Sequence, residues 1–484
     1  MESFTIKAAF GHHQAGRLDE AEAIYRQILK ANPRHAVAIH YLGVVAFQRD
    51  QCERAIELIQ QSISLDPRNA DFFNNLGNVL NRQKRWEAAA DAFENALALR
   101  PRFADAMNNL GGVLVDLERY AEGIEWCQRA LAIRQDYSSP CHNIGQAMFA
   151  QNRPAEALPW LDRALQLRPD DAQAHFTRAL VLLALGRLRE GFGEYEWRWK
   201  WDGFTAPRRS FAQPVWDGRE LGGKTILLYT EQGYGDAIQF ARFATMVAQR
   251  GGEIVILCPP GLRNLLESVR GISRVVAEDD ALPPFDVQLP MLSLPYVLGI
   301  ELGTIPAQVP YLSAPADQRA LWRAKLEAEA ALIVGLVWAG STQHANDRNR
   351  SIRLSQLAPL ASIPGVKLFS LQKGEQAAEL ASLPADGRIA DLGNQVQDFG
   401  QTAAIVEQLD LVISVDTAMA HLAGALGKKC WTLITHRPEW RWLCGRTDSP
   451  WYPTMRLFRQ PTAGDWQSVI EQVAGELRQL AAAK

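Results

Sequence analysis

One spacing recurs along the first part of the chain and constrains the fold more than any other feature. Glycine stands at four positions that are 34 residues apart: Gly43, Gly77, Gly111 and Gly145. Ala9 and Ala179 extend this series at its two ends. Two further sets repeat with the same period at other positions of the unit: Pro33, Pro67, Pro101 and Pro169; and Ala21, Ala55, Ala89 and Ala157. Small residues let two helices approach closely and proline ends a helix, so each period predicts one helical pair.

The pattern resembles that of the tetratricopeptide repeat (TPR) family. It predicts six units, at about 2–35, 36–69, 70–103, 104–137, 138–171 and 172–201. Because each unit buries its apolar face against its neighbours, stacked units form an α-solenoid with a concave groove. We therefore expect a TPR domain over residues 1–203.

Three asparagines follow the same period. Asn75, Asn109 and Asn143 each precede a Leu-Gly or Ile-Gly pair. In the TPR family this position lies on the first helix of the unit, which lines the groove. A carboxamide both donates and accepts hydrogen bonds, so a row of them could bind the backbone of an extended peptide. The row resembles the one in TPR-containing protein O-glycosyltransferases; the alternative is that these amides are simply solvated.

Beyond residue 203 the periodicity changes. A stretch rich in aromatic residues and proline ends the repeats, and residues 204–222 form a predicted connector. Short apolar, β-branched runs then alternate with helical ones: Thr225–Tyr229, Glu253–Cys258, Asp286–Leu289, Leu332–Trp338, Val366–Leu371, Leu411–Ser414 and Cys430–Ile434. This alternation predicts parallel sheets covered by helices. We expect two Rossmann-like halves, 223–311 and 331–484, joined by a linker at 312–330, and a fold of the α + α/β class.

Four motifs occur in order in this second region: EQGYGDAIQFARF, VWAGSTQHANDRNRSI, LFSLQKGE and SVDTAMAHLAGALGK. Together they resemble the heptosyltransferase-like enzymes of glycosyltransferase family nine. The combination with repeats resembles bacterial TPR glycosyltransferases. The resemblance implies a GT-B-type fold, with the acceptor on the first half and a nucleotide-sugar donor on the second. It also implies a single displacement with inversion.

The last motif predicts a diphosphate site. Asp416 and Thr417 stand at a helix start, and His421 lies four residues after Thr417, on the same face. Free amides and the positive end of a helix suit a diphosphate. The alternative is an Asp/Thr cap and a histidine in the core.

Two further loops follow predicted strands. In the family, hydroxyls such as those of Ser341 and Thr342 bind phosphate, and Arg348, Arg350 and Arg353 add positive charge nearby. The resemblance makes Lys373 a candidate phosphate ligand and Glu375 a candidate ribose ligand. For the arginines, Lys373 and Glu375, ordinary solvated loop charge remains the alternative.

The first motif predicts the base. Gly233 and Gly235 permit close approach of a substrate, and Asp236 follows them at a helix start. An attacking hydroxyl needs a general base, and the matching aspartate is the proposed base in the family. The alternative is an aspartate that only caps its helix.

Composition excludes several classes. The formal net charge of −3 gives no reason to expect a nucleic-acid partner. Neither a secretory signal nor an apolar run long enough to span a bilayer is evident. The six cysteines are dispersed without a CxxC pair, which favours a reducing, cytoplasmic setting. No cluster has metal-ligand spacing, so we expect neither metal nor cofactor.

We therefore expect a cytoplasmic glycosyltransferase that moves a sugar from a nucleotide sugar to a protein or peptide acceptor recruited by the repeat groove. One alternative is the same chemistry on a lipopolysaccharide or other surface glycan. The other is a catalytically inactive scaffold whose repeats bind partner proteins.

Overall fold

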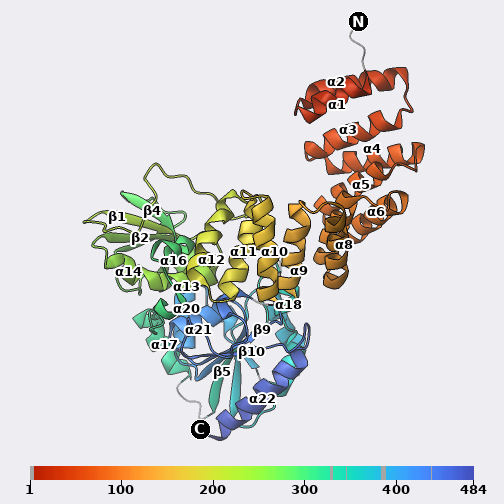
Figure 1. Cartoon of the computed structure of the whole chain (residues 1–484). Helices are drawn as coiled ribbons and strands as arrows, with labels where there is room; N and C mark the ends of the chain where they lie inside the picture. The colour runs from red at the N-terminus through yellow and green to blue at the C-terminus, as the bar shows by residue number, and fades with distance from the viewer. Residues whose placement is uncertain (1–4, 327–330, 345, 383–388, 438, 484) are drawn as a thin grey trace. The chain divides into compact units, whose positions relative to one another are not determined.

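The computed structural model describes residues 5–326, 331–344, 346–382, 389–437 and 439–483. It divides into two compact units, residues 1–177 and 178–484. Figure 1 shows helices alone in the first unit and two parallel sheets with their helices in the second.

The first unit is a stack of paired helices. Their bounds are α1 (Ile6–Gln14), α2 (Leu18–Ala31), α3 (Ala36–Gln48), α4 (Cys52–Leu65), α5 (Ala70–Arg82), α6 (Trp86–Leu99), α7 (Ala104–Asp116), α8 (Tyr120–Ile133), α9 (Ser138–Ala150) and α10 (Pro154–Leu167). Helix α11 (Ala172–Ala184) follows and crosses the boundary between the units. The stack proceeds in chain order (Figure 1), as expected of a solenoid.

The 34-residue period has a steric cause. A Cβ atom on Gly77 would lie 2.5 Å from the Phe93 ring, and one on Gly145 would lie 2.7 Å from Leu161 Cγ. A Cβ on Gly111 would meet Cys127 in the same way. The first helix of each of these pairs therefore contacts the second at a distance that only glycine allows.

The second unit begins with the end of α11, α12 (Leu188–Tyr195) and the short 3₁₀ helix η1 (Glu196–Lys200). Its first sheet has the order β3-β2-β1-β4, with β1 (Thr225–Tyr229), β2 (Glu253–Cys258), β3 (Arg274–Ala277) and β4 (Val287–Pro290). All three pairings are parallel. The helices of this half are α13 (Tyr234–Phe240), α14 (Ala244–Ala248), α15 (Arg263–Leu266) and α16 (Leu294–Val297).

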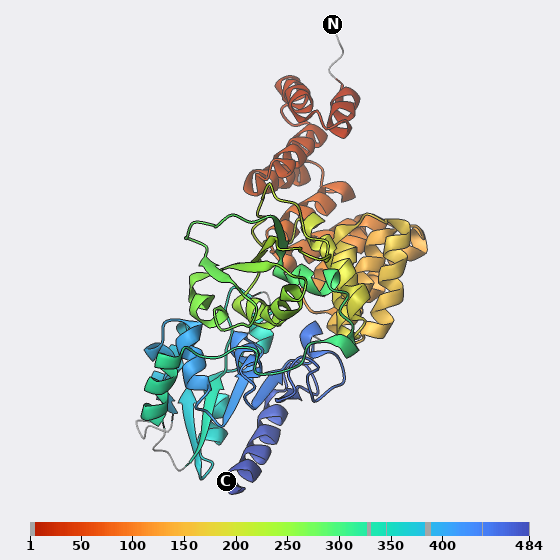
Figure 2. The same cartoon turned by 90° about the vertical axis from the view of Figure 1, so that its left-hand side faces the viewer.

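The second sheet is also parallel and has the order β10-β9-β8-β5-β6-β7. Its strands are β5 (Leu332–Val337), β6 (Val366–Ser370), β7 (Ile389–Asp391), β8 (Leu411–Val415), β9 (Cys430–Ile434) and β10 (Met455–Arg459). Its helices are α17 (Ala316–Leu326), α18 (Asp347–Arg350), α19 (Ala358–Ala361), α20 (Phe399–Val406), α21 (Ala418–Ala425) and α22 (Trp466–Ala482). Helix α22 lies against this sheet (Figure 2).

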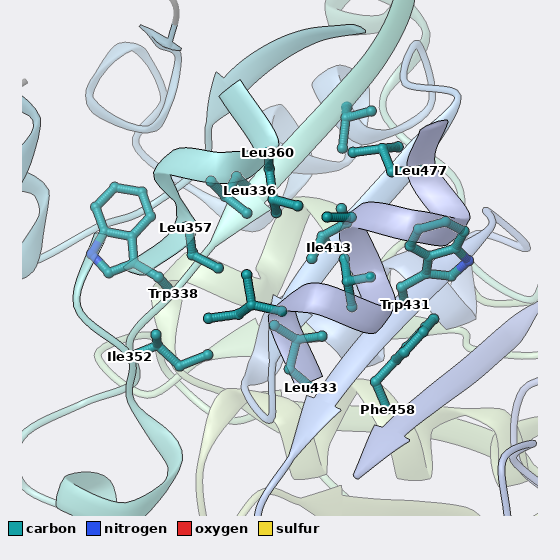
Figure 3. Close-up of a cluster of buried hydrophobic side chains, with 14 of the residues drawn as sticks. Leu336, Trp338, Ile352, Leu357, Leu360, Ile413, Trp431, Leu433, Phe458 and Leu477 are labelled. Atoms are coloured by element: carbon teal, nitrogen blue, oxygen red, sulfur yellow. The ribbon is translucent and has the colours of Figure 1, made fainter. Parts of the chain in front are cut away.

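A large hydrophobic core lies against the second sheet. Every residue of β5 and β8 is buried, which explains their continuous apolar sequences. Leu336, Ile413 and Leu433 meet Leu357 and Leu360 on one face (Figure 3). Burying each such side chain contributes about 1.5–3 kcal/mol, so this half is a rigid base for its loops.

The predicted fold class is confirmed: a helical TPR solenoid precedes a region of parallel, Rossmann-like sheets, which is consistent with a GT-B-type glycosyltransferase. In the second sheet β5 lies between β8 and β6, and in the first β1 lies between β2 and β4. At these strands the order in which the chain adds strands to the sheet reverses. Ligands of such sheets bind beside the strands where the loops on either side run in opposite directions. A ligand is therefore expected beside the loops after β1, β5 and β8.

Candidate active site

The loop after β1 presents Asp236 in the first turn of α13. The N-cap of that helix is Gly233, which has no side chain with which to cap it. The Asp236 carboxylate instead accepts a hydrogen bond at Oδ1 from Nη2 of Arg441. Asp236 is thus the partner of a cation and not the cap of its helix.

Arg441 belongs to the short 3₁₀ helix η9 (Trp440–Trp442), in the loop after β9. It also donates from Nη1 to Glu439, and its guanidinium lies over the Trp440 ring at 4.2 Å. Burial works against the charged guanidinium, but Asp236 and Glu439 raise its pKa above the ordinary arginine value. The arginine therefore stays charged, and it joins loops from the two sheets.

The start of α21 is capped by Thr417. Its hydroxyl accepts from Met419 N at 3.3 Å and lies 3.1 Å from Ser414 Oγ. The backbone carbonyl of Asp416 accepts from Arg350 Nη1 at 2.9 Å. The capping alternative thus holds for Thr417, while Asp416 stands half-buried in front of the helix.

His421 is buried beneath the glycine loop. Its Nδ1 lies 3.0 Å from the Tyr452 hydroxyl, and its ring stacks on Trp442 with centroids 5.1 Å apart. Burial, then the charges of Arg441 and Arg242, lower its pKa well below the ordinary value, so the imidazole is neutral.

Gly235 permits the two halves to meet at this histidine. A Cβ on Gly235 would lie 2.9 Å from His421 Cδ2 and 3.4 Å from Ala418 Cα. The first turn of α13 therefore packs directly on α21. Gly233 has no such constraint, since the nearest atom to its Cβ position is 3.6 Å away.

The loop after β5 exposes Ser341 and Thr342. Ser341 Oγ accepts from Gln343 N at 3.3 Å. Arg350 packs on Gly340 of this loop, where a Cβ would collide with its guanidinium, and reaches Asp416 as described. It thus connects the loops after β5 and β8, whereas Arg348 and Arg353 are exposed.

Lys373 and Glu375 follow β6 and are both exposed. Lys373 Nζ donates to the carbonyl of Val396, and burial of its stem lowers its pKa, with Asp398 and Asp391 opposing. Glu375 begins the 3₁₀ helix η7 (Glu375–Ser382). The structure brings neither residue into hydrogen bonding with Asp236 or Arg441, whose bonds are those given above.

The asparagine row belongs to the first unit. Asn109 donates to Asn74 at 3.2 Å and to Asn78 at 3.0 Å, and Asn143 donates to Asn108 at 3.1 Å. Asn75 lies 3.0 Å from His40 Nε2. All three side chains are half-buried, and they connect successive repeats.

Sequence reasoning missed Arg441, Glu439 and Gln372. Gln372 accepts from the amides of Trp338 and Ala339 and donates to Ala339 O, which fixes the loop after β5. A signal for Arg441 does exist: the letters EWRW at 439–442 repeat those at 196–199.

Within the described residues, no group of three or more His, Cys, Asp or Glu side chains could hold a metal ion. Among those same residues, none of the helices combines the length and apolar character needed to cross a membrane.

Comparison with known proteins finds two kinds of family. Tetratricopeptide repeat profiles match residues 3–27, 42–94 and 102–170. Glycosyltransferase family 9 (heptosyltransferase) matches residues 357–460, which include Asp416, His421 and Arg441. The expected combination is confirmed: TPR profiles match the N-terminal region, and a family 9 (heptosyltransferase) profile matches part of the C-terminal region.

Among curated proteins, Protein FlbA of Caulobacter vibrioides is 28% identical over 357 residues, covering 65% of this chain and 56% of FlbA. The chain thus matches little more than half the length of that relative. Among solved structures, MamA is 25% identical with a TM-score of 0.31, covering 34% of this chain and 96% of MamA. PilW, a type IV pilus biogenesis factor, is 18% identical with a TM-score of 0.37, covering 40% and 89%.

Proposed function

We propose that the chain transfers a sugar from a nucleotide-sugar donor to an acceptor hydroxyl, with Asp236 as the general base. The observation that carries this proposal is the position of Asp236. Its carboxylate extends from the first sheet toward Arg441 of the second, and the same loop packs on α21 through Gly235.

The second half has the features of a donor site. Ser341 and Thr342 expose hydroxyls after β5, and the capped start of α21 lies after β8. Amides at a helix start and hydroxyls together stabilise a diphosphate. Asp416 and Thr417 complete the proposed donor site, and His421 is buried behind it, beneath Gly235. Lys373 and Glu375, exposed after β6, remain candidate ligands.

The reaction then needs no covalent intermediate. Asp236 accepts the proton of the acceptor hydroxyl while that oxygen attacks the sugar, and the diphosphate leaves from the opposite side with inversion. Because cationic side chains and amides can stabilise the leaving group, we propose that no divalent metal is required. Turnover that is lost on chelation and restored by magnesium would contradict this point.

We propose a protein or peptide acceptor, recruited by the repeat groove. Its support is the row of carboxamides at Asn75, Asn109 and Asn143, which repeats along the first unit. We propose a cytoplasmic setting because all six cysteines are unpaired.

The test replaces the carboxylate without changing its size. Asp236→Asn is expected to lower donor turnover about 10²- to 10⁴-fold, the usual contribution of a general base. Asp279→Asn, an exposed position in the same half, is the matched control. Donor turnover is measured by release of nucleoside diphosphate from a panel of nucleotide sugars. Near-normal turnover in Asp236→Asn would show that Asp236 is not the base.

A further inference from the structure

Two segments with the same sequence hold the loop after β1. Glu196-Trp197-Arg198-Trp199 follows α12, and Glu439-Trp440-Arg441-Trp442 follows β9. Each arginine is hydrogen-bonded to the glutamate two residues before it. Each also binds an acid of the loop: Arg198 binds Glu231, and Arg441 binds Asp236.

Arg198 is fixed in place. Its side chain has no exposed surface, and Nε and Nη2 both donate to Glu231 Oε1, at 2.9 and 2.7 Å. Nη2 also donates to Ser293 Oγ at 2.8 Å, and Nη1 to the carbonyl of Tyr195 at 3.2 Å. A buried cation with this many partners would leave several polar groups unpaired if it moved.

Arg441 is held differently. Its side chain is 15% exposed and that of Asp236 is 14% exposed, so a small solute has access to the pair. In the described part of the chain its hydrogen-bond partners are the carboxylates of Glu439 and Asp236. Glu439 lies two residues before Arg441 in the same segment and also accepts from the Arg441 backbone amide, whereas Asp236 comes from another loop. Asp236 is therefore the partner that can be exchanged.

Arg441 also lies beside the start of α21. The next residue, Trp442, stacks on His421 of α21, and Asp416 at the start of α21 is close enough to raise the pKa of Arg441 further. Arg441 therefore lies near the carboxyl ends of β8 and β9, where sheets of this kind bind ligands. A guanidinium matches two phosphate oxygens as well as it matches a carboxylate.

We propose that Arg441 is a ligand of the donor diphosphate and that the donor takes it from Asp236, so the base becomes free only when donor is bound. This inference rests on the proposed function. Without donor, Oδ1 of Asp236 is occupied by Arg441, and an acceptor hydroxyl would have to compete for it. With donor, the phosphate oxygens replace that carboxylate, and the site becomes competent only when both substrates are present.

The chemical step then balances. The acceptor O–H bond breaks and its proton goes to Asp236, while the acceptor oxygen forms a bond to the anomeric carbon. The bond from that carbon to the phosphate oxygen breaks, and the diphosphate leaves with the electron pair, its new charge held by Arg441.

Calorimetric titration tests the exchange, with inorganic pyrophosphate and the diphosphates of uridine, guanosine and adenosine as probes. Asp236→Asn is expected to tighten binding about tenfold, because the competing carboxylate is gone. Arg441→Gln is expected to weaken binding tenfold or more. In the double variant the effect of Asp236→Asn should disappear, since the two residues act through one contact. Asp279→Asn is again the control.

Unchanged or weaker binding in Asp236→Asn, or unchanged binding in Arg441→Gln, would overturn the inference. So would a wild-type protein that turns over a nucleotide sugar but binds none of the probes. These outcomes are independent of the turnover of Asp236→Asn, which decides the role of the base.

Discussion

The repeat glycines and Gly235 perform the same steric task over different spans of the chain. Gly77, Gly111 and Gly145 each let a helix pack on a residue 16 positions further along: Phe93, Cys127 and Leu161. Gly235 lets α13 pack on His421, which is 186 residues away. The first kind of contact recurs with the repeat and is visible in the sequence. The second depends on two separate sheets being brought together.

Gly235→Ala tests the contact between α13 and α21 and is expected to have the largest effect among the glycine and asparagine changes. The new methyl would lie 2.9 Å from His421 Cδ2, against a ring already held by Trp442 and Tyr452. The loop must shift, and a displacement of about 1 Å at a reacting group can lower turnover about 10²-fold. Turnover and pyrophosphate affinity are measured together.

Gly233→Ala is the matched control, because its φ is −66° and its new Cβ would make only ordinary van der Waals contact, 3.6 Å from Asp236 Oδ2. It should retain turnover within a few-fold of wild type. Equal losses in both variants would mean that loop flexibility, and not contact with α21, requires these glycines.

Gly77→Ala tests the contact within a repeat. Its methyl would meet the buried Phe93 ring at 2.5 Å, and overpacking of this kind costs about 1–3 kcal/mol. The expected result is a lower denaturation midpoint of the repeat unit, followed by circular dichroism of the full chain, with donor turnover retained. Gly11→Ala is the control, since no atom lies within 4 Å of its Cβ position. A destabilisation of equal size at Gly11 would refute the steric explanation.

The asparagine row is expected to give the smallest effect. Its test compares binding of the acceptor by the first unit with binding of diphosphate by the second. Asn75→Ala, Asn109→Ala and Asn143→Ala together should weaken binding of the acceptor tenfold or more, at about 0.5–1.5 kcal/mol for each lost hydrogen bond, and leave diphosphate affinity unchanged. Because the same amides link successive repeats, thermal unfolding of the triple variant is measured as well. Asn95→Ala, on the exposed face of α6, is the control. Normal acceptor binding in a folded triple variant would leave the row with the inter-repeat role alone.

The strands that could be predicted are the ones buried by neighbours. The expected runs at Leu332–Trp338 and Leu411–Ser414 correspond to β5 and β8, the fully buried centre of the second sheet. The expectation omitted β3, β7 and β10, which are all edge strands. An edge strand pairs on one side, so its sequence need not be a continuous apolar run. In β10 the sequence MRLFR is interrupted by two partly exposed arginines.

Only part of the candidate site could be predicted from the sequence, for a related reason. Thr417 and His421 share one helix, and Asp236 follows glycines after a strand, so local rules drew attention to them. Whether Asp236 caps its helix was undecided, because the answer depends on Arg441, 205 residues away. Local rules gave no reason to select Arg441, although its EWRW segment occurs twice in the sequence.

The sequence by itself determined the repeat architecture, the alternation of strands and helices, and the residues at the ends of the central strands. Each of these depends on neighbours within one helical pair or one strand-and-helix unit, where spacing along the chain is spacing in the fold. The tertiary structure alone decided that Asp236 binds Arg441, that His421 is neutral and covered by Gly235, and that the asparagines bond to one another. Charge pairing and burial depend on distance in space, and folding sets that distance between residues that the chain itself keeps far apart.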